Sequence, residues 1–208
     1  MKIAVLNETS SADRNGDILE ALSGRGHDII NCGMTRSGAT AGGGPELAYL
    51  HTALMSALLL RTGRADFGVG GCGTGQGYLN AALQYPGVFC GRLESPLDAF
   101  LFARINGGNC VSLALNQGYG WAGNVNLRML FDALFTDERG QGYPAHRQVP
   151  QREARLLLGA VSELAHRPME AIVAALPDAV VAPALRWPGF AALLFSGPVE
   201  EPDRKSVV

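Results

Sequence analysis

The segment Gly70-Gly71-Cys72-Gly73-Thr74-Gly75-Gln76-Gly77 places five glycines among eight residues. A short apolar run over residues 65–69 leads into this glycine-rich segment, and a helix-like pattern over residues 76–84 leaves it. Glycine lets the backbone adopt positive φ and approach a ligand closely. We therefore predict a tight turn from a buried strand into a helix, at the sheet edge where α/β proteins bind ligands.

Cys72 and Thr74 alternate with the glycines of this predicted turn. Backbone N–H groups at a helix start attract anions, and the same surroundings favour the thiolate form of a cysteine. Cys72 is therefore a candidate for chemistry. The alternative is a structural or generally anion-binding turn in which the cysteine is only a small apolar residue. The order G-x-G-x-G-x-G after a third strand, without G-K-[ST], differs from dinucleotide-binding and Walker motifs.

Apolar runs and helical patterns alternate along the first 165 residues. Buried strands are expected over residues 2–7, 27–32, 65–69, 87–93 and 109–115. Helices are expected over residues 15–24, 45–61, 76–84, 96–104, 122–135 and 151–165, the second of them with Pro45 in its first turn. This alternation predicts the α/β fold class, as a Rossmann-like three-layer α/β/α sandwich around a five-stranded parallel sheet.

The chain changes character near residue 165. Residues 1–165 carry the predicted α/β domain, whereas prolines interrupt short apolar patches in residues 166–208. We expect this C-terminal extension to pack on the core or on a neighbouring subunit. The Gly-, Ser- and Thr-rich residues 33–44 form a long connection that is expected to be mobile or functional, and residues 200–208 are expected to fray.

The net charge, the apolar runs and the cysteine spacing of the chain argue against several classes of protein. A net charge of −2 gives no reason to expect a nucleic-acid partner, and no run approaches the ~20 apolar residues of a membrane span. The chain opens with a strand pattern, so we expect no secretory signal. Its four cysteines lack metal-binding spacing, so we expect no metal site, no structural disulfide and a cytoplasmic location.

Further polar residues stand out beyond the glycine-rich segment. His51 lies within the second predicted helix, where a lone histidine is more often a surface or core residue than a catalyst. Arg147, Arg152 and Arg155 form a basic cluster before and within the last core helix. This cluster is either a solvated helix face or a phosphate clamp, which the planar guanidinium suits. Asn106 precedes the fifth strand, where it either caps a turn or donates to an oxyanion.

Together these residues resemble the ribose-5-phosphate isomerase B family, which includes the galactose-6-phosphate isomerase subunits. The most specific part is the core Cys72-Gly73-Thr74-Gly75, which is followed by Ala81-Ala82 and by Asn106-x-x-Asn109 before a strand. Tyr49-x-His51 is similar to a Tyr-Pro-His segment of the family. The resemblance extends over about residues 1–165.

The resemblance implies an aldose–ketose isomerase of carbohydrate metabolism that needs no cofactor. Its substrate would be a sugar phosphate such as ribose 5-phosphate or galactose or allose 6-phosphate. Cys72 would move the proton between sugar carbons 1 and 2, and Thr74 with the loop amides would hold the enediolate. The residues implied to bind the substrate or its phosphate are Gly73, Gly75, Asn106, Arg147, Arg152 and Arg155. The resemblance also implies a homodimer or homotetramer with the active site at the subunit interface.

Three departures from the family pattern concern the surroundings of Cys72. The family has Asp-His after the first strand, where this chain has Glu8-Thr9. It has His-Asn before the fifth strand, where this chain has Ile105-Asn106, and Asn-Lys after the paired alanines, where this chain has Leu83-Gln84. Two family histidines are thereby absent, and Glu8 and His51 are the candidates to replace them as substrate ligands. The alternatives are therefore a sugar or sugar-phosphate binding protein without turnover, and an isomerase of an unphosphorylated sugar.

Overall fold

A five-stranded parallel sheet forms the centre of the computed structural model, which describes residues 1–35, 44–136 and 138–197. The strand order is β2-β1-β3-β5-β4. The strands are β1 (Lys2–Asn7), β2 (Asp28–Asn31), β3 (Phe67–Cys72), β4 (Cys90–Leu93) and β5 (Cys110–Ala114). Residues 200–208, which were expected to fray, and most of the connection 33–44 lie outside the described residues.

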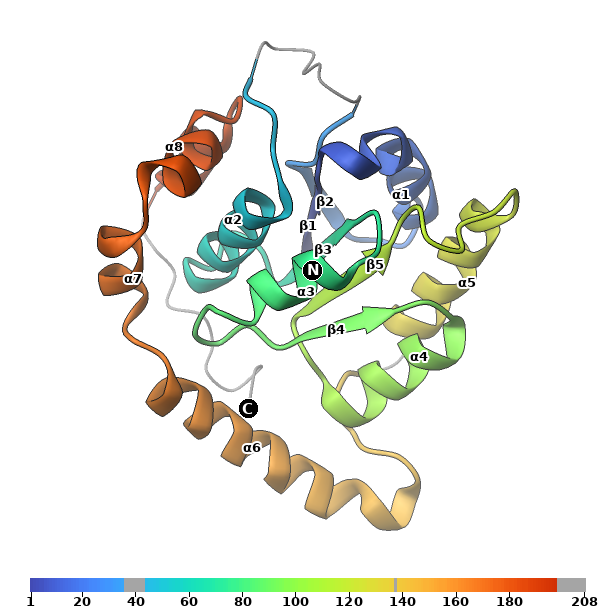
Figure 1. The fold of residues 1–208 in the computed structure, drawn as a ribbon. Helices are drawn as coiled ribbons and strands as arrows, with labels where there is room; N and C mark the ends of the chain where they lie inside the picture. The colour runs from blue at the N-terminus through green and yellow to red at the C-terminus, as the bar shows by residue number, and fades with distance from the viewer. Residues whose placement is uncertain (36–43, 137, 198–208) are drawn as a thin grey trace.

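Helices cover both faces of the sheet (Figure 1), which confirms the predicted α/β sandwich. One face carries α1 (Asn15–Leu22), α4 (Pro96–Leu101) and α5 (Gly123–Phe135). The other carries α2 (Tyr49–Arg61), α3 (Gln76–Ala82), α7 (Met169–Ala175), α8 (Asp178–Arg186) and α9 (Phe190–Leu194). Three short helical turns are η1 (Thr9–Arg14), η2 (Phe102–Asn106) and η3 (Ala145–Arg147), and α6 (Gln148–Ala165) runs along the lower edge in Figure 1.

Strand β1 shows how the sequence divides the core into two layers. Side chains of a strand point alternately to opposite faces. Ile3 and Val5 accordingly pack in the cluster with α1 and α5, whereas Ala4 and Leu6 pack in the cluster with α2 and α3. Because both faces are covered, the strand reads as a continuous apolar run rather than an alternating one.

Three expected boundaries are wrong, and each bears on the site. Helix α2 begins at Tyr49, so Pro45 lies in the segment before it and not in its first turn. Strand β3 continues through Gly70 and Gly71 to Cys72, because hydrogen bonds to β1 and β5 hold these residues extended despite the turn preference of glycine. The helix expected over residues 96–104 extends to Asn106, because the π-helical turn η2 continues α4.

The C-terminal extension forms helices α7, α8 and α9. Trp187, Phe190 and Leu194 are buried in the same cluster as α2. Helix α6 begins at Gln148, three residues before its expected start, and holds Pro150 in its first turn, where a missing N–H breaks no helical hydrogen bond. The division of the chain at residue 165 stays a prediction.

Candidate active site

The candidate site lies where the direction of strand addition reverses. From β1 the chain adds β2 on one side and β3 on the other, so the crevice between the ends of β1 and β3 is the switch point at which open α/β sheets bind ligands. Glu8 follows the last residue of β1, and Cys72 is the last residue of β3. Asn7 pairs with Gly71 across these two strands, so the carboxyl ends of β1 and β3 lie at the same level of the sheet edge.

Cys72 is held firmly at this edge. It pairs with Ala114 of β5, and its carbonyl accepts a hydrogen bond from Leu115 N at 3.1 Å. Its side chain is only 6% exposed, and its Sγ lies 4.0 Å from Oγ1 of Thr74. The thiol is therefore fixed by the strand, with the exposed side chain of Thr74 beside it.

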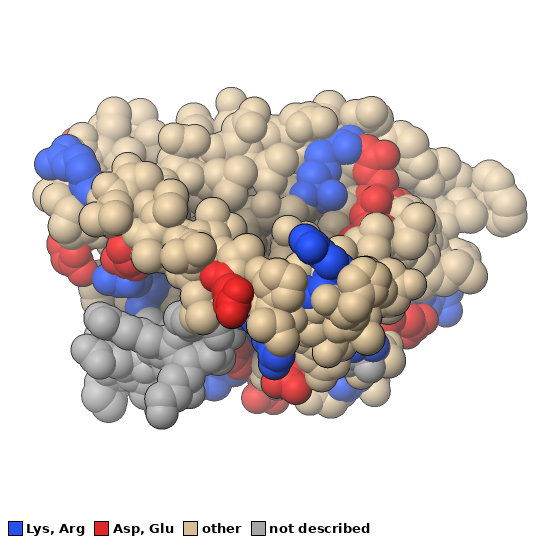
Figure 2. All heavy atoms as spheres, turned by 90° about the horizontal axis from the view of Figure 1, so that it is seen from below, with Lys and Arg blue, Asp and Glu red and all other residues tan. Residues whose placement is uncertain are grey.

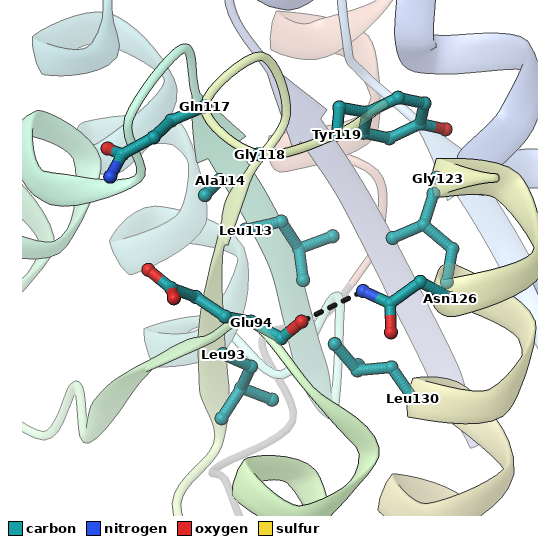
Figure 3. A pocket seen from close by; sticks show the side chains of 11 residues that line it. Leu93, Glu94, Leu113, Ala114, Gln117, Gly118, Tyr119, Gly123, Asn126 and Leu130 are labelled. Atoms are coloured by element: carbon teal, nitrogen blue, oxygen red, sulfur yellow. Dashed lines mark hydrogen bonds between the residues drawn. The ribbon is translucent and has the colours of Figure 1, made fainter. Parts of the chain in front are cut away.

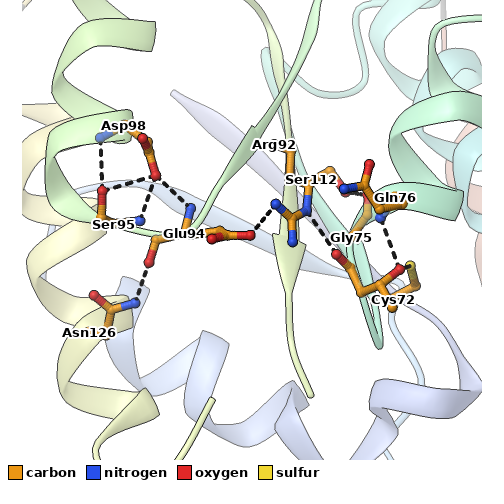
Figure 4. A network of polar contacts seen from close by, with 10 residues as sticks. Cys72, Gly75, Gln76, Arg92, Glu94, Ser95, Asp98, Ser112 and Asn126 are labelled. Atoms are coloured by element: carbon orange, nitrogen blue, oxygen red, sulfur yellow. Dashed lines mark hydrogen bonds and ion pairs between the residues drawn. The ribbon is translucent and has the colours of Figure 1, made fainter. Parts of the chain in front are cut away.

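The turn after Cys72 is tied down by side chains from two neighbouring strands (Figure 4). Arg92 of β4 donates from Nε to the carbonyl of Thr74 at 2.8 Å and forms an ion pair with Glu94. Ser112 of β5 donates to the carbonyl of Gly75 at 2.6 Å. Gly75 has φ +73°, a value that favours glycine. Arg92 was not among the residues expected from the sequence, because nothing in its short strand links it to residue 74.

The backbone N–H groups of the turn differ in availability. The Gly73 N–H donates to Oγ of Ser10 at 3.0 Å. Within the described residues, the N–H groups of Thr74 and Gly75 have no hydrogen-bond partner. Free N–H groups at a fixed turn can stabilise negative charge on a bound oxygen. Thr74 and Gly75 thus offer the free donors, whereas the expected donor Gly73 is engaged.

Glu8 lies beside this turn and is 6% exposed. Its carboxylate caps η1, where it accepts hydrogen bonds from Ser10 N at 3.1 Å and from the Ser10 hydroxyl. Asn116, which follows β5, donates to the Ser10 carbonyl at 2.6 Å. Glu8, Ser10, Gly73 and Asn116 thus form one connected polar group at the switch point. Ser10 was missed from the sequence, where it reads as an ordinary loop residue.

His51 does not reach this polar group through a free nitrogen. Its Nδ1 accepts from the Ala48 N–H at 2.9 Å, so the proton of the neutral ring is on Nε2. Nε2 lies 3.0 Å from the carbonyl of Ala179 in α8 and donates to it. Both ring nitrogens are therefore engaged in joining the start of α2 to the C-terminal helices.

Asn106 and the arginines lie away from Cys72. Asn106 is exposed and precedes β5, whereas Cys72 pairs with the last residue of β5. The length of β5 alone separates these levels by at least ~13 Å. Arg155 of α6 packs against this same edge, because its Cζ would lie 2.9 Å from a Cβ at Gly107. Within one chain the expected residues therefore form two groups, at opposite edges of the sheet.

A cavity of about 140 Å³ lies between β5 and α5 (Figure 3). Its apolar lining belongs to the core cluster on the face of the sheet opposite that of Cys72. It is enclosed by β4, β5, the start of α5 and residues 117–119, and Asn126 donates to the Glu94 carbonyl across it at 2.8 Å. Pockets for small molecules usually measure about 300–1,000 Å³, so this cavity is too small to hold a sugar phosphate alone. Glu94 nevertheless links it, through Arg92, to the turn after Cys72.

The described part of the chain contains no group of three or more His, Cys, Asp or Glu side chains that could hold a metal ion. None of the helices over 1–35, 44–136 and 138–197 is long and apolar enough to cross a membrane.

The fold and the site define an α/β protein that presents a thiol and free backbone N–H groups at its switch point. The chain belongs to the ribose/galactose isomerase family, because the sequence model of that family matches residues 3–147. It is accordingly a sugar isomerase. No protein of curated function has a sequence that matches the chain significantly.

Two solved structures resemble the whole chain. A 4-deoxy-L-threo-5-hexosulose-uronate ketol-isomerase, complexed with a tartrate, shares 34% identity and a TM-score of 0.89, covering 100% of this chain and 95% of its own. A ribose-5-phosphate isomerase from Vibrio parahaemolyticus shares 37% identity and a TM-score of 0.88, covering 100% and 99%. The type B ribose 5-phosphate isomerase of Leishmania infantum, at 16% identity, TM-score 0.62 and 78% and 96% coverage, shows the fold alone.

Proposed function

We propose that the chain interconverts an aldose and a ketose phosphate through an enediolate, with Cys72 as the base. The observation that carries this proposal is the position of the thiol at the switch point, beside the free N–H groups of Thr74 and Gly75. Removing a proton next to a carbonyl creates an oxyanion, and one well-placed donor contributes about 10²–10³ in rate.

The thiolate of Cys72 takes the proton from carbon 2 of the open-chain aldose. The electron pair of that C–H bond forms the C1–C2 double bond, and the carbonyl electrons move to O1, where Thr74 and Gly75 donate N–H groups. Return of the proton to carbon 1, with transfer of the hydroxyl proton from O2 to O1, yields the ketose. Positioning of a base next to the carbon acid contributes typically about 10²–10⁴-fold.

The substrate proposed first is ribose 5-phosphate or a hexose 6-phosphate. The whole-length likeness to the Vibrio ribose-5-phosphate isomerase supports it. A second candidate is an unphosphorylated sugar acid, because the hexosulose-uronate ketol-isomerase also matches the entire chain, including the C-terminal helices. The Leishmania enzyme leaves about a fifth of this chain unmatched, since it covers 78% of it.

We infer that two copies of the chain build each active site, in a homodimer or in a homotetramer of such pairs. Asn106 and the arginines lie at the sheet edge opposite Cys72, so they reach a thiol only from another copy. Helix α6 supports this inference, because Leu157, Val161 and Leu164 share one face and are 68%, 54% and 88% exposed. Seen from below, the molecule shows wide uncharged areas with basic and acidic residues scattered among them (Figure 2).

A cytoplasmic location is proposed on the state of the cysteines. Cys32, Cys72, Cys90 and Cys110 are all free thiols, as is usual in a reducing compartment.

Solvent exchange at carbon 2 tests the isomerase proposal. In deuterated water, the purified protein should exchange the carbon-2 proton of ribose 5-phosphate, allose 6-phosphate or galactose 6-phosphate, or that of the hexosulose uronate. Cys72→Ala should lower exchange by at least about 10²-fold. Cys32→Ala is the matched control, because burial raises the pKa of that thiol to about 11 and it lies outside the site.

Three outcomes separate the candidates. Exchange with phosphorylated sugars supports the first candidate, and exchange with the uronate alone supports the second. Tight binding in calorimetry without exchange would identify a binding protein without turnover. Full activity in Cys72→Ala would refute the role of the thiol.

A further inference from the structure

Ser10 presents a hydroxyl group at the switch point, backed by a buried carboxylate. It is exposed, in the first turn of η1, two residues after Glu8. The hydroxyl donates to Oε1 of Glu8 and accepts from the Gly73 N–H at 3.0 Å. Gly73 directly follows Cys72, so the hydroxyl lies next to the turn that holds the thiol.

The hydrogen-bonding capacity of this hydroxyl is not exhausted. A serine oxygen has one proton and two lone pairs. The proton goes to Glu8 and one lone pair accepts from Gly73. The second lone pair remains available on an exposed residue, where it can accept a proton from a ligand hydroxyl. Ser10 therefore connects the open side of the site with Glu8, which is 6% exposed.

The proposed reaction requires a second proton transfer that Cys72 does not perform. Besides the proton between two carbons, one proton must move between O2 and O1. Both nitrogens of His51 are engaged with Ala48 and Ala179. The hydroxyl of Thr74 accepts from Gln76 N at 3.2 Å and has no carboxylate partner to take up its proton. Of the described groups in contact with this turn, only Ser10 and Glu8 combine an exposed hydroxyl with a proton acceptor behind it.

We propose that Ser10 and Glu8 carry the hydroxyl proton of the sugar between O2 and O1. Ser10 is the catalytic residue that contacts the sugar, and Glu8 is the positioning residue that holds the proton through it. This inference rests on the proposed isomerase function, and it adds a residue that the sequence did not mark.

In the aldose-to-ketose direction, Ser10 and Glu8 first take up the O2–H proton and then return a proton to O1. After Cys72 has taken the carbon-2 proton, the O2–H proton passes to Oγ of Ser10 while the Ser10 proton passes to Oε1 of Glu8. The same path in reverse delivers one proton to O1. As the C2=O double bond forms, the electron pair of C1=C2 takes the proton back from the Cys72 thiol at carbon 1. Ser10, Glu8 and Cys72 end in their starting states.

The test compares two rates in the same protein: deuterium entry into recovered aldose and net formation of ketose. Loss of the oxygen-to-oxygen transfer leaves enediolate formation intact, so the enediolate returns to aldose carrying deuterium. Ser10→Ala and Glu8→Gln should lower net isomerisation by about 10²-fold and lower exchange far less. The ratio of exchange to isomerisation should rise at least tenfold over the unmodified chain.

Two further variants serve as controls. Ser10→Thr restores a hydroxyl and should bring the ratio back toward that of the unmodified chain. Ser11→Ala removes the neighbouring hydroxyl, which donates only to the Glu8 carbonyl at 3.1 Å, and should leave the ratio unchanged. Glu8→Gln keeps Ser10 in place, so it tests the inference even where Ser10→Ala fails to fold.

A parallel fall of both rates in folded Ser10→Ala and Glu8→Gln would overturn this inference, because it would show that the pair only holds the turn at Gly73. Absence of exchange in the unmodified chain with every sugar would instead refute the proposed function itself.

Discussion

At the scale of single residues, the three arginines expected to bind phosphate differ in what holds them. Arg155 is partly buried, and its Nη1 donates to the Gly140 carbonyl at 2.6 Å. Burial, followed by the charge of Arg152, lowers the pKa of the Arg155 guanidinium below its ordinary value. Arg147 and Arg152 are exposed on η3 and α6. Arg155 is thus engaged within the chain, and the other two are available to a ligand.

Replacement of these arginines separates binding from stability. Arg147→Ala and Arg152→Ala should each raise KM for a sugar phosphate about 10-fold or more, because a hydrogen bond to a charged group contributes about 1.5–3 kcal/mol. Their melting temperatures should stay unchanged. Arg155→Ala should lower the melting temperature, since it leaves the Gly140 carbonyl without its donor. Steady-state kinetics and calorimetry check both effects, and unchanged KM values for all three variants would favour an unphosphorylated sugar.

At the scale of elements, β3 depends on glycine to lie beneath α3. A Cβ at Gly70 would lie 1.9 Å from Cζ of the Tyr78 ring. Tyr78 is fully buried, and its hydroxyl contacts Ser56 and lies 3.4 Å from Sγ of Cys110. Glycine at position 70 therefore lets the ring lie directly on the strand. This close packing fixes α3, whose first turn follows the thiol.

Gly70→Ala should destabilise the chain and lower its activity. The added methyl cannot be accommodated without moving Tyr78, and overpacking of a core costs about 1–3 kcal/mol or more. Gly16→Ala in α1 is the matched control, because a Cβ there meets nothing within 4 Å; it should stabilise by about 0.5–1 kcal/mol. Urea unfolding measures both. Equal stability of the two variants would contradict the close packing of Tyr78 on β3.

At the scale of the whole molecule, α6 differs from the other long helices in its packing. Helix α5 is covered along one face by the core and α2 is buried over most of its length, whereas α6 buries only Ser162. The Oγ of Ser162 accepts a hydrogen bond from the Gly87 N–H at 3.1 Å. The apolar outer face of α6 is therefore the surface on which the proposed second copy would pack.

Charge on this face should separate the copies. The double variant Leu157→Glu, Leu164→Glu should shift the chain to monomer in analytical ultracentrifugation, because burying an unpaired carboxylate is strongly unfavourable. Isomerisation should fall with it, since each site would lose its second group of residues. Phe195→Glu, at an apolar residue of 73% exposure outside α6, is the control. A monomeric double variant that keeps full activity would refute a shared site.

The sequence by itself determined the order of the elements, the parallel sheet and the place of Cys72. These features follow from local regularities: apolar runs for buried strands, helical spacing between them, and glycines at the end of the third strand. Each regularity concerns residues a few positions apart, so it can be recognised from the sequence alone. The end of β3 could not be predicted in this way, because hydrogen bonds to other strands hold its last residues extended.

Only the tertiary structure decided which side chains surround the thiol. Ser10 meets Gly73 across 63 positions of the chain, and His51 meets Ala179 across 128. Arg92 and Asn116 join the same turn from separate strand ends. No local spacing encodes such contacts, because they arise when distant strand ends meet at one edge of a folded sheet. The physical reason is that secondary structure depends on near neighbours, whereas a site depends on residues that only packing brings together.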